Sequence, residues 1–235
     1  GITVFVFLLQ LAGPIFLAAG LWEGCPYLWI HEAYSNDIPV CYGMKVNFNI
    51  SEMGEWWRLF TPMLLHGSLM HIAFNMYALR ILGVSLEKFY GHWQFLLLYI
   101  VSGFAGNVAS FVFTVSPSLG ASTAIFGLIG AQGVFAYQNR AVFGKFAEKA
   151  LRDIVMLALL NLAIGYSLAG IDNWGHVGGL IGGIVVAWYG GPMFKFEGVR
   201  PKLALVNQRD NSKIVFAGLA VMTLFAAIAG GVIAQ

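Results

Sequence analysis

Seven apolar segments, each about 20 residues long, are the feature that most limits how this chain can fold. They cover residues 1–22, 69–87, 93–115, 120–139, 151–170, 175–191 and 214–234. A helix of about 20 apolar residues spans the hydrocarbon core of a bilayer. A lone strand cannot cross it, because its backbone groups would stay unpaired in lipid. The sequence therefore predicts an all-α membrane protein that crosses the bilayer repeatedly.

The composition supports burial in a membrane and argues against several other classes of protein. Hydrophobic residues make up 59% of the chain and charged residues only 10%, whereas soluble domains contain roughly 25% charged residues. The net charge of +2 gives no electrostatic basis for binding a nucleic acid. The sequence contains neither a nucleotide-binding loop nor a cysteine cluster suited to zinc. We therefore expect the lipid bilayer as a partner, and no nucleic acid, metal or cofactor.

The distribution of basic residues indicates the orientation of the chain. If the N-terminus is cytoplasmic, most of the Lys and Arg residues fall in inner loops, and the outer loops keep only Lys45 and Arg58. The positive-inside rule favours this arrangement. We expect a multi-pass protein of the plasma membrane with a cytoplasmic N-terminus.

The same topology divides the chain into three parts. Residues 1–192 form a six-helix core that includes a long outer loop at 23–68, residues 193–213 form a cytoplasmic linker, and residues 214–235 form a seventh transmembrane helix. The two cysteines, Cys25 and Cys41, both fall in the outer loop. An oxidising exterior allows a disulfide between them, and free thiols are the alternative.

Two polar residues lie at the outer ends of predicted helices, at similar depth. They are Ser122 in GASTAIFGLIG and His176 in GHVGGLIGG. A histidine inside a membrane span indicates function by default, and a neutral imidazole can take a proton from a serine hydroxyl. Glycines after each residue allow the close approach that this transfer needs. The alternatives are a helix cap for Ser122 and a hydrogen bond to a neighbouring helix for His176.

A third polar group stands in HGSLMHIAFN. His71 and Asn75 are four residues apart, so they share one face of a helix, where they could donate hydrogen bonds to a developing oxyanion. A water-filled cavity or a metal site would be the alternatives. The five-residue spacing of His66 and His71 disfavours a shared metal. Asp172, four residues before His176, is expected in solvent, so a Ser–His dyad is favoured over a triad.

These motifs together resemble the rhomboid family of intramembrane serine proteases, over roughly residues 55 to 190. The matching positions, in family order, are Trp57 and Arg58, then His66, His71 and Asn75, then Glu87 and Gly91 in LEKFYG, then Ser122, and finally His176. The resemblance implies a six-helix core followed by a seventh helix, the family's "six plus one" layout. It implies that Ser122 is the nucleophile and His176 the general base. It also implies that His71, Asn75 and the backbone N–H of Ser122 bind the oxyanion.

The resemblance assigns supporting roles as well. Trp57 and Arg58 would belong to an outer loop that lies partly in the membrane, Glu87 would anchor the inner end of the second helix, and His66 would support the site. This chain departs from the family at two positions. Thr123 stands where many members have Gly, and Phe126 stands where well-known members have Tyr. The ring of Phe126 can still stack on His176, but it has no hydroxyl.

The implied activity is cleavage of single-pass transmembrane proteins near the outer membrane face, without a cofactor. A catalytically inactive relative that binds membrane proteins is one alternative. A transporter or channel is another, but it predicts an internal repeat and polar residues at mid-bilayer depth. The sequence has no such repeat, and its polar residues gather near the outer face.

Overall fold

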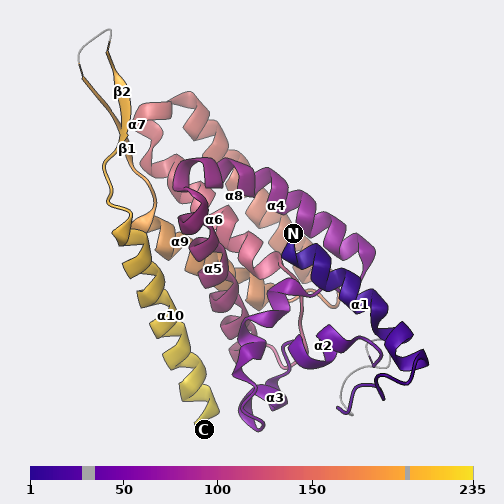
Figure 1. Ribbon diagram of the computed structural model, residues 1–235. Helices are drawn as coiled ribbons and strands as arrows, with labels where there is room; N and C mark the ends of the chain where they lie inside the picture. The colour runs from indigo at the N-terminus through magenta and orange to yellow at the C-terminus, as the bar shows by residue number, and fades with distance from the viewer. Residues whose placement is uncertain (28–34, 199–201, 235) are drawn as a thin grey trace.

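The computed structural model describes residues 1–27, 35–198 and 202–234, and it is predominantly helical (Figure 1). Its long helices each overlap one predicted apolar segment. They are α1 (Ile2–Ala18), α4 (Leu69–Tyr90), α5 (His92–Phe113), α6 (Ser122–Gln138), α8 (Lys145–Ser167), α9 (Asn173–Gly190) and α10 (Ser212–Ile233). Residues 28–34 of the predicted outer loop, 199–201 of the predicted linker and residue 235 lie outside the described residues.

Four of these helices are long and apolar enough to cross a membrane by length and composition. They are α4, α5, α8 and α10. Helix α1 is apolar but has 17 residues, and α6 and α9 have 17 and 18. Length and composition therefore identify four crossings among the described residues, and the complete six-plus-one arrangement remains a prediction.

The predicted outer loop and linker contain more regular structure than expected. The loop holds two short α-helices, α2 (Ile38–Gly43) and α3 (Asn47–Ser51), and two short 3₁₀ helices, η2 (Trp56–Leu59) and η3 (Thr61–Leu64). The linker holds an antiparallel hairpin of β1 (Phe194–Glu197) and β2 (Ala204–Asn207). Figure 1 shows α2 and α3 near one end of the helix bundle and the hairpin projecting from the other. Elements this short carry no long apolar period, which is why the sequence pattern missed them.

The start of α8 also differs from the prediction. The apolar segment was expected to begin at residue 151, but the helix begins at Lys145, directly after the short helix α7 (Arg140–Phe143). Gly144 separates the two helices with a φ of +52°, a conformation that favours glycine. The first turns of α8 are polar, so hydrophobicity alone could not locate its start.

Helix α9 lies between α5 and α6 because its glycines remove side chains from both contact faces. On the α6 face, a Cβ added at Gly179 would overlap the carbonyl oxygen of Thr123, and one added at Gly183 would overlap the backbone of Gly127. The two contacts are four residues apart on each helix, so they repeat once per helical turn. The two backbones therefore touch directly, as small residues allow between membrane helices.

The α5 face of α9 uses a second row of glycines. A Cβ at Gly178 would overlap the side chain of Ala109, and a Cβ at Gly182 would lie 2.7 Å from the Cβ of Ala105. These positions are again four apart on each helix. Two adjacent small-residue rows thus fix the rotation of α9 about its axis, and with it the direction in which His176 points.

We expect Gly179→Ala to destabilise the protein by about 3 kcal/mol, because the added methyl must push the α6 backbone away. Gly230→Ala in α10 is the matched control, since a Cβ there meets nothing within 4 Å. The thermal unfolding midpoint of each variant in detergent measures the difference. Equal midpoints for Gly179→Ala and wild type would contradict the backbone contact between α6 and α9.

Candidate active site

Ser122 and His176 face each other across the contact between α6 and α9. Ser122 is the first residue of α6 and His176 lies in the first turn of α9. The Nε2 atom of His176 is 2.9 Å from the Oγ atom of Ser122, a hydrogen-bond distance. The His176 side chain is buried, with only 8% of the residue exposed. A hydroxyl and an imidazole at this distance can exchange a proton.

Phe126 orients the imidazole. It lies one turn after Ser122 on α6, and its ring stacks on that of His176 with centroids 4.2 Å apart and planes 10° apart. The stacking leaves the ring edge, with Nε2, directed at Ser122. An aromatic face without a hydroxyl is sufficient for this contact.

His71, at the start of α4, lies beside the serine. A Cβ added at Gly120 would be 2.9 Å from Nε2 of His71 and 3.5 Å from Oγ of Ser122. Gly120 also has a φ of +138°, which L side chains rarely adopt. Both the backbone conformation and the close contact with His71 therefore require glycine at residue 120. Because glycine has no side chain, the His71 ring can lie next to Ser122.

Asn75 is buried one turn after His71, as their spacing predicted. Its Nδ2 atom donates a hydrogen bond to the carbonyl of His71 over 2.9 Å. Within the described part of the chain, no hydrogen bond joins Asn75 to Ser122 or His176. The structure therefore brings His71 to the pair directly and leaves Asn75 bonded to its own helix.

His66 packs edge-on against His71, with ring centroids 4.9 Å apart. It lies between η3 and α4 and is buried. Burial and the neighbouring His71 lower the pKa of His66 to about 4, so its ring is neutral near pH 7. Among the described residues, no three His, Cys, Asp or Glu side chains are grouped to hold a metal ion.

Gln10 of α1 holds the backbone of His66 in place, and sequence reasoning missed it. The amide donates to the carbonyl of His66 over 2.9 Å and accepts from its N–H over 3.1 Å. It also donates to Asp37 over 2.8 Å. The signal in the sequence was a lone amide within an apolar segment, which is costly in lipid unless it is paired.

Asp172 is not the solvated residue that the sequence suggested. It caps α9, since Oδ1 accepts from the N–H of Gly175 over 2.9 Å, and it also accepts from the hydroxyl of Thr114 over 3.3 Å. Its Oδ2 atom is buried and has no hydrogen-bond partner among the described residues. A half-buried carboxylate therefore stands one turn before His176 on the same helix.

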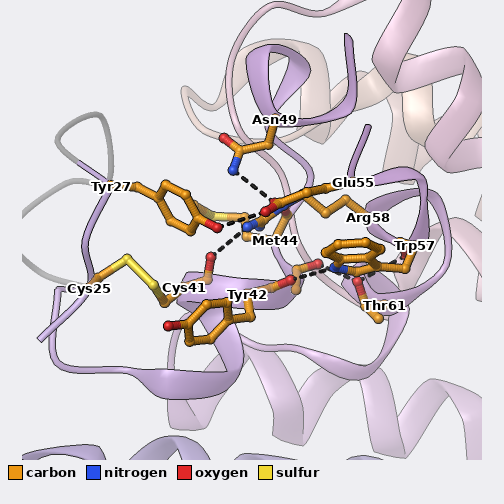
Figure 2. A network of polar contacts seen from close by, with 11 residues as sticks. Cys25, Tyr27, Cys41, Tyr42, Met44, Asn49, Glu55, Trp57, Arg58 and Thr61 are labelled. Carbon is orange, nitrogen blue, oxygen red and sulfur yellow. Dashed lines mark hydrogen bonds and ion pairs between the residues drawn. A yellow bond between two sulfur atoms is a disulfide. The ribbon is translucent and has the colours of Figure 1, made fainter. Parts of the chain in front are cut away.

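Arg58 organises the outer loop from inside and is fully buried (Figure 2). Its guanidinium pairs with Glu55 and donates to the carbonyls of Met44 and Cys41, each over 2.8 Å. Cys41 also forms a disulfide with Cys25, which settles the alternative left open by the sequence. Trp57 is 40% exposed, and its indole donates to the carbonyl of Tyr42 over 3.0 Å.

Glu55 is the acceptor that balances this buried charge. It accepts hydrogen bonds from Tyr27 over 2.7 Å and from Asn49 over 2.8 Å, in addition to Arg58. Burial alone would raise the pKa of Glu55, but these three donors lower it overall. The carboxylate therefore stays ionised beside Arg58.

Lys45 is a second fully buried cation of the outer loop. Its ammonium donates to the carbonyls of Thr114 and Ser110, over 2.8 and 3.4 Å, at the C-terminal end of α5. Burial lowers the pKa of Lys45 to about 8, and the nearby Asp172 carboxylate offsets part of this effect. Lys45 thus joins the loop to the helix end beside the start of α9.

Glu87 lies near the end of α4, far along that helix from His71. Its carboxylate is 2.6 Å from Nδ1 of His92, the first residue of α5. Gly91, with a φ of +87°, makes the turn between them. The pair joins two consecutive helices at the end of the bundle away from Ser122.

Fold and site together define a helical membrane protein with a part-buried serine–histidine pair at the ends of two packed helices. A family model of the Rhomboid domain matches residues 53–193. The chain belongs to the rhomboid family, and it is a multi-pass integral membrane protein.

Three relatives illustrate the similarity. Rhomboid protease GluP of Bacillus subtilis (strain 168) is 41% identical over 79% of this chain and 34% of its own length. RHOMBOID-like protein 9, chloroplastic, of Arabidopsis thaliana is 32% identical over 81% of this chain and 45% of its own length. RHOMBOID-like protein 1 of Arabidopsis thaliana is 37% identical over 68% of this chain and 39% of its own length. The chain therefore spans less than half the length of each of these relatives.

The buried Lys45 predicts a pH dependence of stability. Its folded pKa of about 8 lies below the ordinary 10.5, so the unfolded chain binds more protons between these values and stability rises with pH there. Relative to Lys45→Met, wild type should gain about 3 kcal/mol across this window. Thermal unfolding of both proteins at several pH values measures the gain. Parallel pH curves would show that Lys45 keeps its ordinary pKa.

Proposed function

We propose that this protein is an intramembrane serine endopeptidase that cleaves single-pass transmembrane proteins through a Ser122–His176 dyad. The observation that carries the proposal is the 2.9 Å distance between His176 Nε2 and Ser122 Oγ at the adjacent N-terminal ends of two helices. Membership of the rhomboid family and the similarity to a bacterial rhomboid protease support it.

The proposed reaction has two stages. Oγ of Ser122 bonds to the carbonyl carbon of the substrate while its proton passes to Nε2 of His176. His176 then gives this proton to the leaving amine, and an acyl-enzyme remains. Water attacks the ester and gives a proton to His176, which returns it to Oγ as the acid leaves.

The developing oxyanion would be stabilised from two directions. The backbone N–H of Ser122 belongs to the first turn of α6, where helical N–H groups lack intrahelical partners and favour negative charge. The His71 ring, next to Gly120, is the second donor. Asn75 would join it only after turning away from the His71 carbonyl.

The substrate would enter from the lipid and unwind locally, because a helix hides its carbonyls in its own hydrogen bonds. Cleavage near the outer face follows from the proposed topology, with a cytoplasmic N-terminus in the plasma membrane. In this arrangement residues 1–192 form the six-helix core, 193–213 the cytoplasmic linker and 214–235 the seventh crossing. The outer loop, with Trp57 and Arg58, would lie partly in the membrane beside the core, and Glu87 would lie at the inner end.

Replacing Ser122 or His176 by Ala should lower cleavage by at least about 1,000-fold, since either change removes the dyad. The assay is the purified protein with a panel of single-span substrates, with the cut mapped by mass spectrometry. Ser167→Ala and His92→Ala are matched controls, because the Ser167 hydroxyl bonds to Ala163 and the His92 ring to Glu87, and neither bonds to Ser122 or His176. A fluorophosphonate should label Ser122 only when His176 is present.

The same assay separates the alternative function. A catalytically inactive rhomboid-like protein would bind single-span proteins without cleaving any of them, and its Ser122→Ala variant would bind equally well. Cleavage that persists in Ser122→Ala or His176→Ala would exclude the proposed dyad.

Asp172 supplies a further test of the mechanism. The charged and titratable groups acting on His176 are Asp172 on its own helix and His71 on α4, and Lys45 acts on Asp172. Asp172→Asn keeps an oxygen to cap α9 but removes the negative charge that stabilises the imidazolium formed in the reaction.

We expect Asp172→Asn to lower kcat about tenfold and to shift the acidic limb of the pH–rate profile to lower pH, since the imidazole then needs more acid to be protonated. Asp210→Asn is the control, because Asp210 accepts a backbone N–H in the same way near the start of α10. An unchanged profile in Asp172→Asn would mean that the carboxylate acts only as a helix cap.

A further inference from the structure

A cavity of about 460 Å³ lies at the opposite end of α6 from Ser122. Its walls come from the last turns of α6 and α9, from α7 and from the segment between β2 and α10. The lining includes two arginines, Arg140 and Arg209, and two aromatic residues, Tyr137 and Trp188. The volume falls within the range of small-ligand sites.

Both arginines are held in place by neutral groups. Nη1 of Arg209 donates to the carbonyl of Gly191 over 2.9 Å, at the end of α9. Nη1 of Arg140 donates to the carbonyl of Tyr137 over 2.7 Å, and the guanidinium carbon lies 4.2 Å from the centre of that ring. Each guanidinium has five N–H donors, so these contacts leave several donors for a ligand.

Neither arginine has an acidic partner in the described part of the chain. The ion pairs there are formed by Arg58, His92 and Lys149, and no Asp or Glu lines the cavity. The nearest acid in sequence, Asp210, is exposed and accepts from the N–H of Ser212. Burial lowers the pKa of Arg209, which an anion in the cavity would reverse.

The aromatic residues place the cavity at a membrane surface. The rings of Tyr137 and Trp188 stack with centroids 5.8 Å apart, and the two residues are 42% and 43% exposed. Tyr and Trp at helix ends are enriched at the level of lipid headgroups. At that level a phospholipid would present its phosphate to the arginines and its glycerol and acyl carbons to the rings.

We propose that this cavity binds the headgroup of an anionic phospholipid, with Arg140 and Arg209 donating hydrogen bonds to the phosphate. Arginine forks match phosphate oxygens in pairs. An anionic lipid is favoured over a zwitterionic one because it brings no ammonium group next to the two arginines. Lipid binding at this cavity does not depend on catalysis.

Native mass spectrometry of the full chain in detergent tests the proposal, with phosphatidylglycerol and phosphatidylcholine as probes. We expect phosphatidylglycerol to bind about tenfold more tightly, and Arg140→Gln to abolish that preference. Lys145→Gln is the matched control, because Lys145 carries the same charge at the start of α8 and does not line the cavity. Equal binding of both lipids, or a preference that survives in Arg140→Gln, would overturn the proposal.

Two further measurements keep the test decisive. Arg209→Lys retains the positive charge at the end of α9 but loses the paired donors, and it should show weaker phosphatidylglycerol binding with an unfolding midpoint near that of wild type. Inorganic phosphate, added as a competitor, distinguishes a lipid site from a free-anion site. Displacement of the lipid by phosphate at comparable concentration would assign the cavity to a free anion and refute the lipid.

Discussion

The direct contact between the backbones of α6 and α9 is the constraint on which the candidate site depends. Ser122 and His176 are 54 residues apart in sequence and belong to different helices, and neither side chain is long. They reach hydrogen-bond distance because Gly179 and Gly183 let α9 rest on the backbone of α6. Lipid supplies no hydrophobic force to press two membrane helices together, so close packing of small residues is the available source of association. The geometry of the dyad thus depends on the glycines, because larger residues would hold α6 and α9 apart.

Much of this arrangement could be predicted from the sequence, and the reason is local periodicity. Apolar length marked the long helices, and the four-residue spacing of His71 and Asn75 marked a shared face. The outer loop could not be predicted in the same way. Lys45 and Gln10 look like isolated polar residues in sequence, and their partners, Thr114 and His66, lie far along the chain. Contacts of this kind depend on tertiary structure, which no local pattern encodes.

The two basic residues of the outer loop, Lys45 and Arg58, are both buried inside it. In the proposed orientation Lys45 and Arg58 would lie on the outer side, against the general preference for basic residues inside. Both are fully buried and donate to backbone carbonyls, so neither presents its charge at the loop surface. The charge of Arg58 is balanced by Glu55, and that of Lys45 lies near Asp172. Arg58 therefore joins parts of the loop to one another, whereas Lys45 joins the loop to the end of α5.

The two ends of the bundle differ in whether their cations have protein partners that balance the charge. At the end near Ser122, the buried cations Lys45 and Arg58 donate to backbone carbonyls, and Arg58 also pairs with Glu55. At the other end, Arg140 and Arg209 share a cavity with no carboxylate among the described residues. An end whose cations are paired internally suits a site that must hold two side chains in register. An end with unneutralised cations suits contact with anionic headgroups, as proposed for the cavity lined by Arg140 and Arg209.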